Sequence, residues 1–382
     1  MHDSSIGKKC ALCSTPLTRS NQTKEHIIPH SIGGRKKTKG FICIACNSAG
    51  GENWEVVLAN QFLWFSLATG VKREDGDHPN LLVNTTEGEK LLLRHDGTMV
   101  PAKPHYEEQD SENGNVKIQI KARTTDEAKK MIKGVARKYP SIDPNIATKD
   151  LLTQESYLDS PLEMSLQFGG PEAGRSMVKT ALALASEYGV DHEECGKAVD
   201  YLKNAEAPPP FGFCYTVDLI VNRPLDDIFH CVAVSGLPKH GKLLGYIEYF
   251  NTARIIIELS GDYGGKEFHH SYAIDPTTGI ELDIQVNFNV QIDILNSIIN
   301  SDGMPLDKYT EVVSEVLPII LKKNFQREKD RAIAAAMKFA YERLGVKPDE
   351  DLSLEKYEEL LAIIREQLTP FIQAQTKNHF FN

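Results

Sequence analysis

The chain has 382 residues, of which 41% are hydrophobic and 25% are charged. This composition is ordinary for a soluble globular protein, and the length allows two or three domains with cores of their own. No run of 18 apolar residues occurs, so we expect no membrane span, and the polar first nine residues lack the apolar segment of a secretory signal. These features exclude a membrane protein and predict a cytoplasmic one.

The formal charge is unevenly distributed along the chain. The whole sequence carries −10, whereas residues 1–50 carry eight Lys/Arg and two acids, which gives +6 there and −16 over the rest. A uniformly basic nucleic-acid binder is therefore excluded. A locally basic N-terminal surface is nevertheless what contact with a phosphate backbone requires.

Four of the seven cysteines form two pairs with the spacing of metal ligands, Cys10-x2-Cys13 and Cys43-x2-Cys46. Two such pairs satisfy a tetrahedral four-cysteine zinc site, and a reducing cytosol would keep these thiols free to bind the metal. The 29 residues between Cys13 and Cys43 exceed the gap of a plain zinc ribbon. Something is thus inserted between the two pairs, although a ribbon without catalysis is the simpler interpretation of the cysteines alone.

The insert carries Glu25-His26-Ile27-Ile28-Pro29, and Asn47 directly follows the last cysteine. This combination resembles the HNH, or ββα-metal, nuclease family over roughly the first 65 residues. The resemblance implies that Glu25 and Asn47 bind a divalent metal and that His26 is the general base. The acid is Glu where Asp or His is more usual, and the middle Asn/His that orients the base has no match. A backbone carbonyl or His30 could orient His26 instead.

Phosphodiester hydrolysis requires the chemistry that these residue types offer. A near-neutral imidazole can take a proton from water, and a cation can stabilise charge at the scissile phosphate. Carboxylate and amide oxygens suit Mg2+ or Mn2+, whereas thiolates suit zinc, so the two metals are expected to sort by ligand. Beside this site, Gly33 and Gly34 precede a basic cluster that we expect to contact phosphates: Arg35, Lys36, Lys37 and Lys39.

Beyond the module, apolar spacing predicts one helix near 54–65 ended by Gly70, and strands at 91–93 and 116–120 around a solvated acidic loop at 107–115. The other expected helices are 125–139, 172–188, 192–205, 327–344 and 354–368. The expected antiparallel strands are 214–221, 230–234, 243–250, 254–259 and 280–286. His269 and His270 are expected in a β-hairpin turn.

The predicted fold class is α+β, with an N-terminal zinc-stapled ββα-metal module, a helical middle region and an antiparallel β-rich C-terminal region with terminal helices. The proline run at 208–210 marks one boundary. The expected domains are 1–70 for the nuclease module, 71–207 for a mixed, mainly helical region, and 208–382 for the β-rich region and the helices that follow it.

These patterns favour a metal-dependent HNH endonuclease that hydrolyses DNA. From the architecture, we expect that it acts in restriction or anti-phage defence. The C-terminal region would recognise substrate, sense a signal or form a homo-oligomer. One alternative is an HNH effector nuclease gated by a small signalling nucleotide. The other is a non-catalytic zinc protein that binds nucleic acid, which would need neither Glu25, His26 nor Asn47.

Overall fold

The chain forms two compact units in the computed structural model, which describes residues 8–111, 115–149, 156–301 and 303–379. The first unit contains the chain up to His78 together with Leu166–Lys323, and the second contains Pro79–Ser165 and Asn324–Asn382. In the first unit, Leu166–Lys323 packs on the N-terminal module. The domain boundaries expected at residues 70 and 207 stay a prediction.

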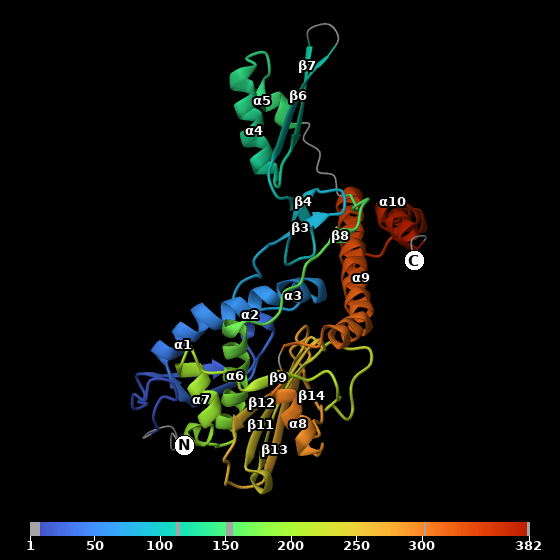
Figure 1. Cartoon of the computed structure of the whole chain (residues 1–382). Coiled ribbons are helices and arrows are strands. Elements are labelled where there is room, and N and C mark those ends of the chain that lie inside the picture. Colours follow the sequence, from blue (N-terminus) through green and yellow to red (C-terminus); the bar gives the residue numbers. More distant parts are fainter. Residues whose placement is uncertain (1–7, 112–114, 150–155, 302, 380–382) are drawn as a thin grey trace. The chain divides into compact units, whose positions relative to one another are not determined.

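The N-terminal module has the predicted ββα order (Figure 1). Its elements are β1 (Gln22–His26), the 3-10 turn η1 (His30–Ile32), β2 (Lys37–Cys43), α1 (Ile44–Gly50), the π-helical turn η2 (Gly51–Glu55), α2 (Val56–Gln61) and α3 (Leu63–Thr69). Gly34 closes the turn between the strands, where a Cβ would lie only 1.8 Å from the Ile28 carbonyl oxygen. Only glycine fits this close approach of two backbone segments.

The rest of the first unit is built around a six-stranded antiparallel sheet. Its strand order is β14-β13-β10-β11-β12-β9. Its strands are β9 (Phe211–Phe213), β10 (His230–Leu237), β11 (Lys242–Tyr249), β12 (Ala253–Ser260), β13 (Phe268–Ile274) and β14 (Glu281–Leu282). Alternate residues of β10 enter two different cores: Val232 and Val234 lie in one, Cys231 and Ala233 in the other. The sheet is therefore covered on both faces.

Helix α6 (Pro171–Glu187) lies between the N-terminal module and one face of this sheet (Figure 1). It is buried continuously from Ala173 to Ala185, and α7 (Gly196–Lys203) packs beside it. Ile27 and Ile28 of the module share a single hydrophobic core with α6 and the sheet. The opposite face of the sheet is covered by α8 (Ile292–Ile299). The module and the sheet thus meet through α6 and also directly, since the His230 Nε2 atom of β10 lies 2.8 Å from the Ile32 carbonyl.

The second unit contains two smaller sheets and several helices. A four-stranded sheet has the order β5-β4-β3-β8, and β6 pairs with β7 in a hairpin. These strands are β3 (Leu81–Thr85), β4 (Lys90–Leu93), β5 (Met99–Pro101), β6 (His105–Ser111), β7 (Asn115–Lys121) and β8 (Leu162–Glu163). The helices are α4 (Thr125–Lys138), α5 (Pro144–Lys149), the second part of α9 (Leu306–Leu344) and α10 (Leu354–His379). Among the described residues, no helix is long and apolar enough to cross a membrane.

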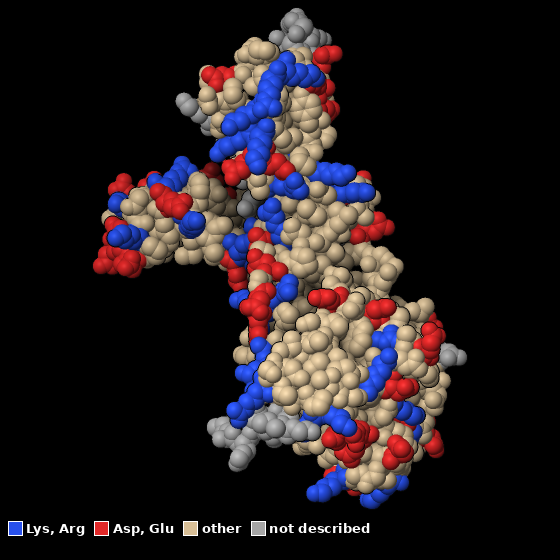
Figure 2. All heavy atoms as spheres, turned by 90° about the vertical axis from the view of Figure 1, so that its left-hand side faces the viewer, with Lys and Arg blue, Asp and Glu red and all other residues tan. Residues whose placement is uncertain are grey.

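Helix α4 presents a basic surface. Figure 2 shows Lys and Arg side chains gathered along this helix of the second unit. The exposed cations are Lys129, Lys130, Lys133, Arg137 and Lys138. Gly134 lies among them, and a Cβ there would meet nothing within 4 Å. At Gly134 this face of the helix is therefore open and packs against no described residue.

The α+β class and the order of its regions are confirmed, whereas several element limits are corrected. The 54–65 helix is divided by η2 and by a break at Phe62. Of the solvated loop expected at 107–115, residues 107–111 belong to β6 and Asn115 begins β7, because these strands pair, and residues 112–114 lie outside the described residues. His269 and His270 lie inside β13 and not in a turn. Of the strands expected at 214–221 and 280–286, only β14 and an isolated bridge between Ile220 and Val286 form.

Candidate active site and metal centre

The four paired cysteines converge on one point. Their Sγ atoms all lie within 4.8 Å of one another, and the Sγ atoms of Cys13 and Cys43 are 3.7 Å apart. A disulfide would be about 2.05 Å long, whereas the edge of a tetrahedron with Zn–S bonds of about 2.3 Å is about 3.8 Å. The amide of Cys43 also donates to the Cys10 sulfur at 3.4 Å. The donor set fits zinc. A bound zinc ion would hold the start of α1, the helix that follows β2, against the N-terminal loop that carries Cys10 and Cys13.

Glu25 and His26 are the last two residues of β1, and their side chains have different partners. Glu25 lies opposite Thr38, and His26 lies opposite Lys37 in the antiparallel register. Glu25 and Thr38 are both buried, at 5% and 2% exposure. The Thr38 hydroxyl makes no hydrogen bond to any described residue. The inner face of the hairpin therefore carries polar groups that a bound cation and its waters could use.

Three side-chain oxygens converge on the ammonium group of Lys179, which comes from α6. The Glu25 carboxylate lies 2.6 Å from Lys179 Nζ, and the Glu55 carboxylate also pairs with it. The Asn47 amide oxygen lies 3.4 Å from the same nitrogen. The structure thus brings Glu25 and Asn47 together around one ammonium group, and their role as metal ligands stays a prediction. It also adds Glu55, and it places a protein cation there.

This cluster is withdrawn from solvent. The side chains of Lys179, Glu25 and Glu55 are 3%, 6% and 14% exposed. Burial raises the pKa of Glu25 to about 7, although the charge of Lys179 opposes the rise. Burial also acts to raise the pKa of Glu55, but attraction to Lys179 and hydrogen bonds leave that pKa lowered. Of the two carboxylates, Glu55 therefore holds its negative charge more firmly at neutral pH.

The ring of His26 is held by Glu74. The His26 Nε2 atom lies 3.2 Å from the Glu74 carboxylate, which also accepts from Lys37 at 2.7 Å. Burial, followed by repulsion from Lys37, lowers the pKa of His26. The imidazole is therefore neutral at neutral pH, and donation of Nε2–H to Glu74 leaves the lone pair on Nδ1. Glu74, and not a backbone carbonyl, orients this ring, while the His30 ring lies 5.1 Å away.

The basic cluster after the glycines contacts the protein itself. Arg35 donates to the Lys72 carbonyl at 2.7 Å, and Lys37 pairs with Glu74. The Lys36 ammonium lies over the rings of Tyr188 and Tyr272, at 5.6 and 5.3 Å from their centroids. Lys39 is exposed. That these four cations contact phosphates stays a prediction, and three of them would have to exchange or share the partners they already have.

Three residues that contact the predicted site residues were not predicted from sequence: Glu55, Glu74 and Lys179. Glu55 follows Asn47 by two turns of the same helical run, and this spacing could have indicated it. The π-helical turn between them is a feature often found at functional sites. Glu74 lies in an irregular segment with no periodic signal, and Lys179 belongs to a helix more than a hundred residues away. Neither has a local signature that could connect it to Glu25.

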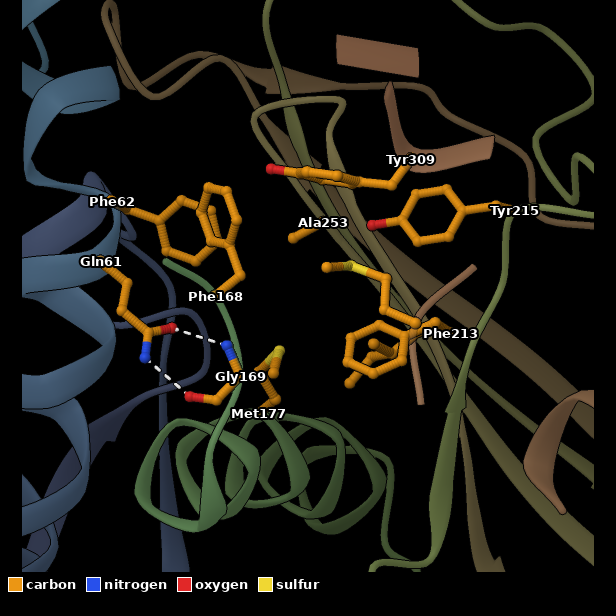
Figure 3. A pocket seen from close by; sticks show the side chains of 11 residues that line it. Gln61, Phe62, Phe168, Gly169, Met177, Phe213, Tyr215, Ala253 and Tyr309 are labelled. Atoms are coloured by element: carbon orange, nitrogen blue, oxygen red, sulfur yellow. Dashed lines mark hydrogen bonds between the residues drawn. The ribbon is translucent and has the colours of Figure 1, made fainter. Parts of the chain in front are cut away.

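An aromatic cavity lies elsewhere in the first unit, between α2, α6 and the sheet (Figure 3). Its volume of about 10 Å³ has room for about one water molecule. Gln61 closes one side by pairing with both the amide and the carbonyl of Gly169, at 3.1 and 2.7 Å. Phe62, Phe168 and Tyr309 surround the rest, as Figure 3 shows. This cavity is a packing defect between elements and is too small for a substrate.

Comparison with known families agrees with this geometry. Residues 10–63 match the family model described as HNH endonuclease, a span that includes both cysteine pairs, Glu25-His26 and Asn47. The predicted resemblance is confirmed: this segment is an HNH endonuclease domain with a four-cysteine cluster. No curated protein and no solved structure matches the chain. The domain indicates a nuclease that acts on nucleic acid, and the cluster indicates zinc.

Proposed function

We propose that this protein is an endonuclease that hydrolyses DNA phosphodiester bonds with the aid of a divalent cation. The observation that supports the proposal most strongly is the convergence of the Glu25 carboxylate and the Asn47 amide on one buried cationic position. His26 follows Glu25 directly and has its ring fixed by Glu74. A protein that only bound nucleic acid through a zinc module would have no need of these groups.

The oxygen donors suit a hard divalent cation. Glu25, Asn47 and Glu55 would hold Mg2+ or Mn2+, since both ions prefer carboxylate and amide oxygens to the thiolates of the zinc cluster. When bound, the ion would stabilise the negative charge that develops on the phosphate and on the leaving oxygen. The zinc ion would have a structural role only, and the position of Asn47 directly after Cys46 would let that zinc fix the direction of the amide.

His26 would act as the general base. Its neutral ring offers the Nδ1 lone pair to a water molecule, because Nε2–H is donated to Glu74. The water oxygen would form the new bond to phosphorus as its proton passes to Nδ1, and the P–O bond to the leaving oxygen would break. Glu74 would stabilise the resulting imidazolium through its carboxylate. Lys37 pairs with the same carboxylate, and its positive charge limits how strongly Glu74 attracts the proton of His26.

Restriction or anti-phage defence is the biological role that we propose from the architecture. A nuclease module joined to a large second region is typical of such proteins. The rest of the chain would then recognise DNA or respond to a signal, and α6 is one of the elements of the first unit that contact the module. The basic face of α4 supports a nucleic-acid partner for the second unit.

Plasmid cleavage tests the proposed function. Purified protein and His26→Ala would be incubated with plain plasmid, modified phage DNA and RNA, with and without Mg2+ or Mn2+. We expect cation-dependent DNA cleavage that falls by about 10²–10⁴-fold in the variant, since this is the usual contribution of a general base. His30→Ala, which alters the neighbouring ring, is the matched control. Cleavage that survives His26→Ala unchanged would place the activity elsewhere.

A further inference from the structure

Lys179 occupies the position that a catalytic cation would need. Its ammonium group contacts the carboxylates of Glu25 and Glu55 and lies near the Asn47 amide oxygen. These are the same oxygens that the proposed function assigns to Mg2+ or Mn2+. A lysine ammonium and a divalent ion cannot share them at contact distance, because the two cations repel each other strongly in a buried setting.

Lys179 is not a surface side chain that can swing aside. Its side chain is 3% exposed, and the helix that carries it is buried on all sides from Ala173 to Ala185. A Cβ at Gly50 of the nuclease helix would lie 3.6 Å from the Lys179 nitrogen, so α6 and that helix are close together. To vacate the site, the side chain must adopt another rotamer in a packed environment, or α6 must shift.

The position of α6 is in turn fixed by the sheet. The Tyr249 hydroxyl of β11 donates to the Thr180 hydroxyl at 2.9 Å, one residue along from Lys179. A Cβ at Gly245 of β11 would lie only 2.9 Å from the Ala181 side chain, so strand and helix approach as closely as a glycine allows. Any shift of α6 away from the module must therefore disturb its packing on β11.

We propose that Lys179 is a built-in counter-cation that competes with the divalent ion, so that the nuclease site loads its metal only when Lys179 leaves Glu25, Asn47 and Glu55. This inference rests on the proposed function, because it concerns the same oxygens. It gives α6 a part in the reaction as the element that decides whether the site is closed by lysine or open to metal. A ligand that moved the sheet against α6 would then control cleavage.

Mn2+ binding in the absence of DNA tests the proposal. The wild type, Lys179→Met and Lys179→Arg would be titrated with Mn2+ and the free ion measured by electron paramagnetic resonance. Removal of the ammonium in Lys179→Met should tighten Mn2+ binding by at least about tenfold, since a unit charge at contact distance is worth more than that. Lys179→Arg keeps the charge and should bind no more tightly than the wild type.

Lys197→Met is the matched control, because Lys197 also pairs with a buried carboxylate, that of Glu258, on another side of the unit. It should leave Mn2+ affinity unchanged. Adding Glu55→Gln to Lys179→Met should weaken the new binding. If Lys179→Met does not fold without metal, Mn2+ should restore the folded state, seen as a rise in the melting temperature at millimolar ion. No such rise, or equal affinity in a folded variant, would overturn the proposal.

Cleavage assays separate this inference from the proposed function. If both hold, Lys179→Met should need less Mn2+ for half-maximal DNA cleavage than the wild type. If Lys179 instead replaces the metal as the cation of the reaction, the wild type should cleave DNA in a chelator and Lys179→Met should not, and the competition proposal would fail. If Mn2+ binding tightens but no variant cuts DNA, the competition stands and the proposed function fails.

Discussion

The N-terminal module has two cation-binding clusters that are built in different ways. The four-cysteine cluster is contained in residues 10–46, and its spacing is visible in the sequence. The second cluster combines Glu25 and Asn47 of the module with Lys179 of a distant helix. A cluster made by one local segment depends on that segment alone, whereas a cluster completed from a distant helix can respond to whatever moves that helix. If the proposals hold, the four-cysteine cluster is a structural site and the second cluster is one that can be regulated.

Loss of the first cluster should have the largest effect. Cys43→Ala removes a ligand from the junction of β2 and α1 and should abolish zinc binding and unfold the module. Structural zinc contributes roughly 10–16 kcal/mol of apparent binding free energy to small domains of this kind. Zinc content per chain and circular dichroism would be measured. Cys195→Ala is the control, since Cys195 is a buried thiol outside the cluster. A folded Cys43→Ala protein without zinc would show that the module does not depend on it.

Loss of Lys179 should have the next largest effect, on stability in the absence of divalent ions. Lys179→Met leaves two buried carboxylates without a cation, and breaking such a buried pair costs about 3–5 kcal/mol. Urea unfolding in chelator would measure the loss. Adding Glu25→Gln removes one of the uncompensated charges and should recover part of it. An equal loss in Lys197→Met, whose side chain is half exposed, would mean that the cluster has no special place in the stability.

A buried histidine at the junction of module and sheet should make stability depend on pH. His230 lies at 0% exposure and its Nε2 atom is 2.8 Å from the Ile32 carbonyl, while Nδ1 accepts from the Phe250 amide at 3.1 Å. Burial lowers the pKa of His230 to about 4. The unfolded chain, with a histidine pKa near 6.5, then binds the proton first as the pH falls, so stability is complete above pH 6.5 and decreases toward pH 4.

The loss over that interval should be up to about 3 kcal/mol from this residue. Unfolding would be followed at several pH values for the wild type and for His230→Gln. The glutamine can donate and accept in the same place but does not titrate. Its stability should change less between pH 6.5 and 4. The same pH dependence in both proteins would assign the effect to other groups.

The smallest expected effects concern the basic surfaces. Lys133→Ala with Arg137→Ala removes two exposed cations from α4, and Lys39→Ala removes an exposed cation from β2. Each lost phosphate contact should make the slope of log K for duplex DNA binding against log salt concentration shallower by roughly 0.9. It should not change which sequence is cut. Binding would be titrated at several salt concentrations. A changed cleavage preference with an unchanged salt slope would mean that these residues read bases.

The sequence predicts well what neighbouring residues determine. The cysteine spacing, the Glu25-His26 pair and Asn47 identify the module, and the spacing of apolar segments between polar turns locates β10, β11 and β12. It fails where a distant partner decides the outcome. The acidic residues 107–111 form a strand only because β7 pairs with them. Lys179 looks from its spacing like any polar residue of a helix, and only the fold brings it to Glu25.

Anomalous diffraction from Mn2+-soaked crystals tests the central claim most directly. Crystals of the wild type and of Lys179→Met would be soaked in the same Mn2+ concentration and measured at the manganese edge. The account predicts a manganese peak among the oxygens of Glu25, Asn47 and Glu55 in the variant, weaker in the wild type, where the Lys179 nitrogen holds that position. A peak of equal height with Lys179 still in place, or manganese bound away from these three residues, would contradict it.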